Sequence, residues 1–205
     1  MVKQVLPSRR VETVIVTNDR PVSVYLCPMC LRPSSRKALI LRHLELKHQV
    51  PPAELAAVSA DLITVPGATG YPDTNLKGKF EKAAEALETY DFVLLHINGT
   101  DILSHDAKRE EKARFIEKID ASLGRALEKI DLKKTVVVIT SDHRTASDPS
   151  YKQYRHTSDP VPVLISGDGV RPGIARKFNE KACRDGFMLK GNDLMEFVLS
   201  SAGKS

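Results

Sequence analysis

The stretch FVLLHINGTDILSH, residues 92–105, joins an apolar strand to two side chains of the kind that bind metals. Its first six residues include five apolar ones, which is typical of a strand covered on both faces, and an Asn-Gly pair ends the run. A helix that begins near Thr100, a good N-cap, would place Asp101 and His105 on one face because they are four residues apart. The spacing suits a metal site, although a capping carboxylate and a surface histidine would give the same pattern.

The composition is that of an ordinary globular protein. The chain has 205 residues, of which 41% are apolar and 28% are charged, enough for one or two domains with a sizeable core. No apolar run approaches the roughly 18 residues that a membrane span needs, and the N-terminus lacks the apolar segment of a signal peptide. We therefore expect a cytoplasmic protein with no membrane partner.

The excess positive charge lies in the first 60 residues. They hold nine Lys or Arg against four Asp or Glu, so the remaining residues balance at 22 of each out of the totals of 31 and 26. An excess of five charges favours a solvated face over an acidic partner such as nucleic acid. Two of the three cysteines also lie in this part, close together, which in a reducing compartment favours a metal site over a disulfide framework.

The same 60 residues contain the ligand spacing of a C2H2 zinc finger. Cys27 and Cys30 are separated by two residues, twelve more lead to His43, and another four lead to His48. Two thiolates and two imidazoles would close a tetrahedral site for a structural zinc ion. A cysteine pair near a turn with two exposed histidines is the alternative.

The local pattern around these ligands agrees with the ββα form of a zinc finger. Residues 11–17 and 22–26 predict a β-hairpin with a turn between them, and residues 34–48 predict a short helix. The helix positions that would face DNA bases are Arg36, Leu39 and Arg42. A central leucine reads bases poorly and one finger covers only about 3 base pairs, so a stabilising or protein-contact role fits as well as nucleic-acid binding.

From residue 61 onward, apolar strands alternate with amphipathic helices, which predicts an α/β domain with a parallel sheet and flanking helices. We expect strands at residues 62–65, 92–97, 135–140 and 161–166, and helices at residues 76–89 and 192–202. The longest helix, between the second and third strands, carries the apolar stripe Phe115, Ile116, Ile119, Leu123, Leu127 and Ile130. The predicted organisation is a zinc-finger-like module at residues 1–60 and an α/β domain at residues 61–205.

A second carboxylate and imidazole pair, Asp142 and His143, follows the predicted strand at residues 135–140. Ligands of open α/β sheets bind beyond the carboxyl ends of parallel strands, so this pair should face the same crevice as Asp101 and His105. His156 precedes the last strand and can reach the same edge. Oxygen and nitrogen donors in this mixture suit Mn, Zn or Fe, and five ligands indicate a pair of metals; three unrelated structural histidines are the alternative.

Four motifs, in order, resemble the second half of the archaeal-type cofactor-independent (2,3-bisphosphoglycerate-independent) phosphoglycerate mutases of the alkaline phosphatase superfamily. They are VPGATGYPDTN (65–75), DFVLLHINGTDILSH (91–105), VVVITSDH (136–143) and RHTSDPVPVLISGDGV (155–170). The resemblance implies a partial alkaline-phosphatase-like parallel sheet and two divalent metals (Mn, Zn or Mg). It implies that Asp101, His105 and His156 hold one metal, and that Asp142 and His143 help to hold the other. The implied reaction interconverts 3-phosphoglycerate and 2-phosphoglycerate, a step of glycolysis and gluconeogenesis, through a phosphoserine.

The sequence also departs from the family. We recognise no counterpart of the nucleophilic serine, of a further metal-binding aspartate or of the inserted substrate-clamping domain. Asp19 could replace that aspartate, but it falls in the predicted hairpin turn. Residues 102–104 are more apolar than expected, and Arg144 replaces a small hydroxyl residue. We therefore assign no catalytic residue and expect little mutase activity from this chain alone, with phosphoglycerate as the substrate only if a missing half completes the site. The edges and apolar surface that such a half would cover favour self-association or a complementary chain as partner. A non-enzymatic nucleic-acid- or protein-binding adaptor and another hydrolase of the superfamily are the alternatives.

Overall fold

The computed structural model describes residues 13–17, 25–26, 33–34, 60–148, 150 and 156–201 of the chain. The four predicted zinc ligands, Cys27, Cys30, His43 and His48, lie outside the described residues. The structural zinc site therefore stays a prediction. None of the helices in the described ranges is long and apolar enough to cross a membrane.

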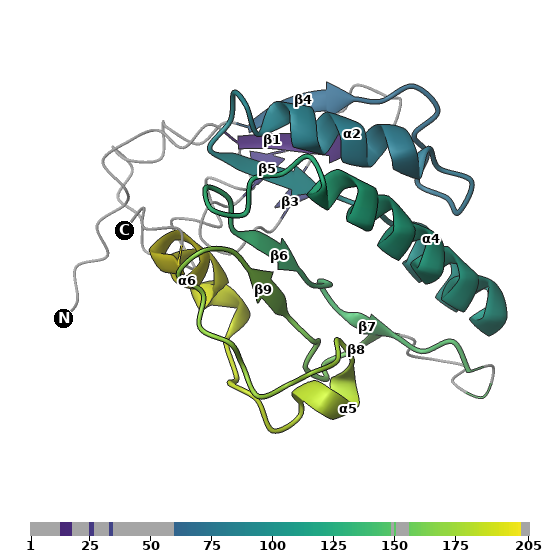
Figure 1. The fold of residues 1–205 in the computed structure, drawn as a ribbon. Helices are drawn as coiled ribbons and strands as arrows, with labels where there is room; N and C mark the ends of the chain where they lie inside the picture. Colours follow the sequence, from purple (N-terminus) through teal and green to yellow (C-terminus); the bar gives the residue numbers. More distant parts are fainter. Residues whose placement is uncertain are drawn as a thin grey trace.

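The main sheet has three parallel strands in the order β4-β1-β5 (Figure 1). Strand β1 (Thr13–Thr17) lies in the middle, with β4 (Ala60–Thr64) on one side and β5 (Phe92–Leu95) on the other. Both edges of β1 are thus paired, so the predicted hairpin between residues 11–17 and 22–26 is wrong. One strand of this sheet comes from the first 60 residues, and the division of the chain at residue 60 stays a prediction.

The short strands form three further pairs, all antiparallel. They are β2 (Tyr25–Leu26) with β3 (Pro33–Ser34), β6 (Val137–Ile139) with β9 (Leu164–Ser166), and β7 (Arg144–Thr145) with β8 (His156–Thr157). The expected strands near residues 135–140 and 161–166 thus exist, but they are antiparallel and outside the three-stranded parallel sheet. A parallel pair needs a crossover connection, usually a helix, whereas the described part of the chain between β6 and β9 contains only β7 and β8.

Three helices follow the strands in the predicted order. Helix α2 (Leu76–Ala86) packs on β1 and β5, α3 (Gly99–His105) follows β5, and α4 (Arg109–Leu127) packs on both α2 and α3. Asn75 caps α2, since its Oδ1 accepts a hydrogen bond from Gly78 N at 2.9 Å. The C-terminal part contains α5 (Glu180–Cys183), the 3-10 turn η2 (Gly191–Asp193) and α6 (Leu194–Ser201).

A small apolar core holds α3 in place. Leu76, Leu103 and Phe115 form this cluster, one from each of the three helices, and Ile97 and Ile119 pack against it. Phe115 is only 3% exposed, as its place in the predicted stripe requires, but Ile116 is 48% exposed and does not belong to the buried face. The helix that begins next to the predicted metal ligands is therefore fixed by contacts to α2 and α4.

Gly99, the first residue of α3, provides a test of this packing. A Cβ atom at Gly99 would lie 2.6 Å from Cε1 of Phe115, closer than real contacts allow, and 3.2 Å from Cα of Pro72, tighter than most real contacts. We expect Gly99→Ala to lower the free energy of unfolding by about 1–3 kcal/mol, measured by urea denaturation, because the core must shift to admit the methyl group.

Gly124 in α4 is the matched control for this substitution. A Cβ at Gly124 meets nothing within 4 Å, so Gly124→Ala should be neutral or should stabilise the protein by up to about 1 kcal/mol through helix propensity. Equal effects of the two substitutions would contradict the close approach of Gly99 and Phe115.

Lys79 of α2 gives a pH-dependent prediction. The residue is 1% exposed, its Nζ donates to the carbonyl of His96 at 3.0 Å, and burial lowers its pKa below the ordinary value of 10.5. In the window between the lowered and the ordinary pKa the unfolded chain binds more protons, so the contribution of Lys79 makes the folded state more stable as the pH rises. Urea denaturation should show wild type gaining stability relative to Lys79→Met as the pH rises toward 10.5.

The exposed Lys77 on the same helix is the matched control, and Lys77→Met should follow wild type across the same pH range. A loss of wild-type stability relative to Lys79→Met with rising pH would show that the pKa of Lys79 is raised.

Candidate metal centre

The residues 92–105 fold as the sequence predicts in outline. Strand β5 leads directly to α3. Asp101 lies in the first turn of α3 and His105 in its last turn. The helix begins one residue before the expected Thr100, with Asn98 in the N-cap position and no side-chain cap. The carboxylate and the imidazole meet on one face, with Asp101 Oδ1 at 3.5 Å from His105 Nε2.

His156 of β8 completes a triangle of donor atoms with this pair. Its Nε2 is 2.8 Å from His105 Nε2 and 3.5 Å from Asp101 Oδ1. Two donors that each bind a tetrahedral metal at about 2.1 Å lie roughly 3.4 Å apart, so the two contacts of Asp101 Oδ1 have the spacing of ligands of one ion. The shorter contact between His105 and His156 is at hydrogen-bond distance. The side chains of all three residues are partly open to solvent, which leaves room for an ion to enter.

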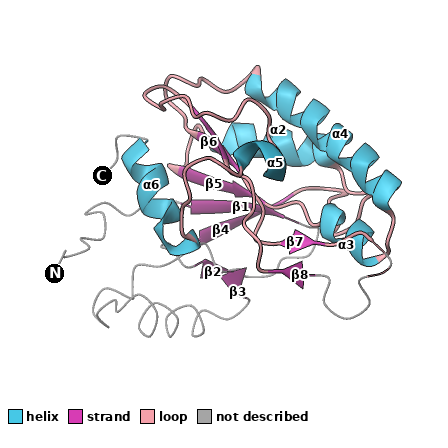
Figure 2. Cartoon of the chain, turned by 90° about the horizontal axis from the view of Figure 1, so that it is seen from below, coloured by secondary structure: helices cyan, strands magenta, loops and turns pink. Residues whose placement is uncertain are grey.

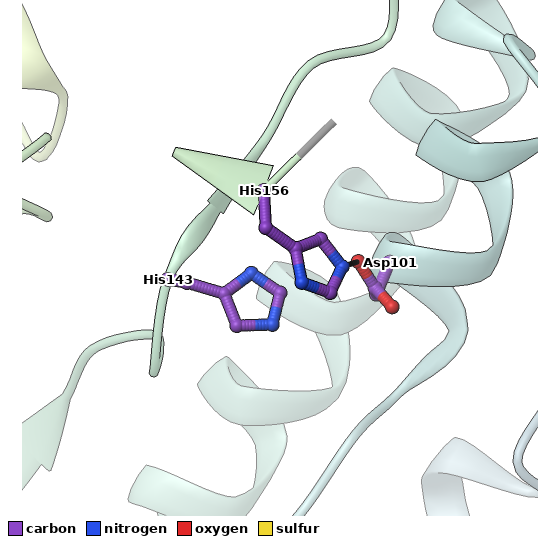
Figure 3. Close-up of side chains that lie close together, drawn as sticks. All are labelled: Asp101, His143 and His156. Atoms are coloured by element: carbon purple, nitrogen blue, oxygen red, sulfur yellow. Dashed lines mark ion pairs between the residues drawn. The ribbon is translucent and has the colours of Figure 1, made fainter. Parts of the chain in front are cut away.

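His143 lies on the other side of His156, as Figure 3 shows. The two imidazole rings stack with centroids 3.9 Å apart and an interplanar angle of 26°. Asp101, His143 and His156 each offer a ligand atom, and these atoms lie within 4.8 Å of one another. The cluster of Asp101, His105, His143 and His156, which we call the histidine cluster, thus gathers four of the five predicted metal ligands.

Asp142, the fifth predicted ligand, lies at the exposed margin of the histidine cluster. Its Oδ2 is 3.5 Å from His143 Nε2, and its side chain is 84% exposed. Its Oδ1 accepts a hydrogen bond from the backbone N–H of His143 at 3.1 Å. The carboxylate of Asp142 therefore contacts the cluster only at His143.

A polar network that the motif analysis missed lies behind the histidine cluster. Lys112 of α4 donates to Ser104 Oγ at 2.6 Å, and Ser104, which is 0% exposed, donates to the carbonyl of Thr100 at 2.9 Å. Ser147 Oγ donates to Ser104 Oγ at 3.2 Å. Burial lowers the pKa of Lys112, while the nearby carboxylates of Asp101 and Glu180 oppose that shift. The network joins α3, α4 and the segment after β7.

Thr145 of β7 is the second feature that was missed. Its Oγ1 lies 2.7 Å from Asp101 Oδ1 and 3.1 Å from His143 Nδ1. Its only sequence signal is that it follows His143 by two residues, but His143 precedes β7, which begins at Arg144, so no strand pattern joined the two residues. No local pattern signals Lys112, since it belongs to a separate helix from Asp101 and meets the network only through packing.

Arg144, the unusual residue after His143, serves a different purpose. It is next to Thr145 in β7, and adjacent strand residues point to opposite faces. Its guanidinium lies 3.6 Å from Asp159 Oδ2 and 3.8 Å from Glu180 Oε1. These exposed ion pairs join β7 to α5 and to the segment after β8, so the arginine contributes to the support of the site.

Comparison with known proteins places this geometry in a family context. Residues 52–201 match the model of the metalloenzyme superfamily. The chain is 40% identical over 151 residues to the 2,3-bisphosphoglycerate-independent phosphoglycerate mutase of Thermococcus kodakarensis, which covers 73% of this chain and 36% of that protein. It is 44% identical over 144 residues to a second such mutase, from Archaeoglobus fulgidus, with 69% and 34% covered. The chain thus spans about a third of the length of these relatives.

Solved structures give the same result for the fold. The PH0037 protein from Pyrococcus horikoshii matches with a TM-score of 0.72 and 30% identity, over 96% of this chain and 50% of that one. The phosphoglycerate mutase of Leishmania mexicana, solved at low cobalt concentration, matches with a TM-score of 0.52 and 16% identity, over 94% and 35%. The second likeness supports the fold alone. An alkaline-phosphatase-like α/β fold with small sheets is thereby confirmed. The match to the family model and to the mutases confirms the resemblance of the sequence to that family.

Proposed function

Because the chain belongs to the metalloenzyme superfamily, we propose that it is a divalent-metal-dependent phosphoryl-transfer module of the phosphoglycerate mutase type. The observation that carries this proposal is the convergence of Asp101 Oδ1, His105 Nε2 and His156 Nε2 within 2.8–3.5 Å. Three donors from two distant segments lie at distances suited to one metal, in a chain whose curated relatives are mutases. The proposed substrates are 3-phosphoglycerate and 2-phosphoglycerate.

The histidine cluster and Asp142 offer enough donors for two neighbouring metal ions. Asp101, His105 and His156 would hold the first ion, and Asp142 and His143 would contribute to the second. Carboxylate and imidazole donors suit Mn and Zn, and the carboxylates also suit Mg. His105 and His156 must both be neutral to bind through Nε2, and the 2.8 Å contact between these atoms has room for at most one proton.

The residues of the chain have defined tasks in such a reaction. When bound, divalent metals neutralise the charge of the transferring phosphoryl group and of the attacking oxygen. The histidine cluster would hold the metal ions in place. The hydrogen bonds of Lys112 and Ser147 to Ser104 join α3 to α4 and to the segment after β7. We assign no nucleophile to this chain, and we propose that a complementary polypeptide supplies the serine and the remaining substrate contacts.

For residues 1–60 the proposal of a structural zinc site at Cys27, Cys30, His43 and His48 stands on the sequence spacing. Thiolate ligands select zinc, whereas Mn²⁺ prefers oxygen and nitrogen donors. Because the donors of the histidine cluster also suit Zn, a cysteine substitution distinguishes the two kinds of site in one protein.

Metal binding is the first test. We expect the dialysed chain to bind Mn²⁺ in isothermal titration calorimetry. Asp101→Asn should weaken the Mn²⁺ affinity by about 100-fold or more, because it removes a charged donor, whereas the loss of an outer hydrogen-bond partner alone costs roughly 10–100-fold. Asp106→Asn, which changes the next and more exposed acid of the same segment, is the matched control and should bind as wild type does. Cys27→Ser should lose zinc, measured by elemental analysis, and keep Mn²⁺ binding. Equal Mn²⁺ affinity in wild type and Asp101→Asn would overturn the proposed metal centre.

Turnover is the second test. We expect residues 1–205, loaded with Mn²⁺, to show no conversion of 3-phosphoglycerate to 2-phosphoglycerate above background in an enolase-coupled assay, because the mutase reaction needs a serine nucleophile that we do not find. The full-length mutase of Thermococcus kodakarensis is the positive control in the same assay. Mutase turnover by the purified chain without a partner would show that the nucleophile lies within it.

A further inference from the structure

Thr145 is the residue on which the histidine cluster converges. Its hydroxyl lies between Asp101 Oδ1, at 2.7 Å, and His143 Nδ1, at 3.1 Å. Its backbone pairs with that of His156 in the β7–β8 ladder. Three members of the cluster are thus connected through this one residue: Asp101 of α3, His143, which immediately precedes β7, and His156 of β8.

The two contacts of the hydroxyl determine where the protons lie. An ionised carboxylate can only accept hydrogen bonds, so the hydroxyl proton of Thr145 must point to Asp101. The hydroxyl then has only lone pairs to offer His143, and a favourable contact at 3.1 Å requires a proton on Nδ1 of the imidazole. The resulting chain runs from His143 Nδ1–H to Thr145 Oγ1–H to Asp101 Oδ1.

This chain of hydrogen bonds leaves the other imidazole nitrogen free of its proton. Nε2 of neutral His143 then carries a lone pair, and it lies 3.5 Å from Asp142 Oδ2. A nitrogen lone pair and a carboxylate oxygen at that distance can bind the same cation. The oxygen of Asp101 that accepts from Thr145 is also the oxygen nearest to His105 and His156.

We propose that Thr145 is a positioning residue, which selects the Nδ1–H tautomer of His143 and thereby connects the two halves of the metal centre. The proposal deepens the proposed function, on which it rests, by naming the group that orients one ligand from each half. Second-layer hydrogen bonds of this type set the tautomer and orientation of metal-binding histidines.

The position of Thr145 is itself well supported. Lys112 Nζ lies 3.4 Å from the carbonyl of Thr145 and 2.6 Å from Ser104 Oγ. The side-chain amine of this α4 residue therefore links the backbone of β7 to α3 through hydrogen bonds. Helix α3 packs against β7, and Figure 2 shows the two elements next to each other. The hydroxyl therefore projects from a fixed backbone, as a positioning role requires.

Thr157 offers a matched control for a purely structural role. It lies next to His156 in β8, as near to the cluster in sequence as Thr145 is, and its Oγ1 is buried with no hydrogen-bond partner among the described residues. Thr157→Val therefore removes a buried hydroxyl beside the cluster without breaking a hydrogen bond that the structure shows. Thr145→Ser keeps the hydroxyl and tests rescue.

The tautomer is measured first, in the metal-free full chain, by long-range ¹H–¹⁵N NMR of the histidine side chains at a pH where imidazole is neutral. We expect His143 to carry its proton on Nδ1 in wild type, Thr145→Ser and Thr157→Val, and to lose this preference in Thr145→Val. A proton on Nε2 of His143 in wild type would overturn the proposal without any variant, and so would an unchanged tautomer in Thr145→Val.

Mn²⁺ affinity is measured second, on the same proteins, with circular dichroism to confirm that they are folded. We expect Thr145→Val to bind Mn²⁺ about 10–100-fold more weakly than wild type, with affinity restored in Thr145→Ser and unchanged in Thr157→Val. An equal loss in Thr145→Val and Thr157→Val would show a general packing effect and overturn the positioning role. If wild type itself binds no Mn²⁺, the proposed function fails, and the tautomer measurement still decides the role of Thr145.

Discussion

One oxygen atom, Asp101 Oδ1, lies where the separate parts of the α/β region meet. It is within 3.5 Å of imidazole nitrogens from α3 and β8, and it accepts a hydrogen bond from β7. A carboxylate so close to several nitrogen donors is stable only when those donors are arranged to share protons or a cation with it. The positions of α3, β7 and β8 are therefore coupled to one another through this atom.

The apolar core makes that coupling possible. Leu103 of α3 packs against Leu76 and Phe115, while Asp101 and His105 of the same helix belong to the histidine cluster. Gly99 allows the helix to start against the ring of Phe115, where any larger residue would push α3 outward. The chemistry of the site thus depends on packing between α2, α3 and α4, several residues away from the donor atoms. This dependence is typical of metal sites, in which rigid elements hold the ligands before the ion binds.

The relation to the mutases is clearest in this same region. The model of the metalloenzyme superfamily matches residues 52–201, which contain the histidine cluster, and the chain spans about a third of the length of the mutases that it resembles. The described structure brings together four of the five ligands that the resemblance implies, and it places Asp142 at the exposed margin. A site open on one side suits a phosphoryl-transfer centre that takes further contacts from a second polypeptide, which is the arrangement that we propose.

Spacing along the chain was enough to predict the strand before Asp101, the helix that aligns Asp101 with His105, and the burial of Phe115. These features follow from residue spacing and from contacts within a few positions of the chain. Other features depended on the complete fold. They are the pairing of β1 with β4 and β5 and the antiparallel direction of β6 and β9. The exposure of Ile116 and the contacts of Thr145 and Lys112 also belong to this group. An apolar run predicts a strand but not which strand lies beside it, because pairing depends on the free energy of the whole arrangement. The hydrogen bond from Thr145 to Asp101 joins residues 44 positions apart, so only folding could bring the two together.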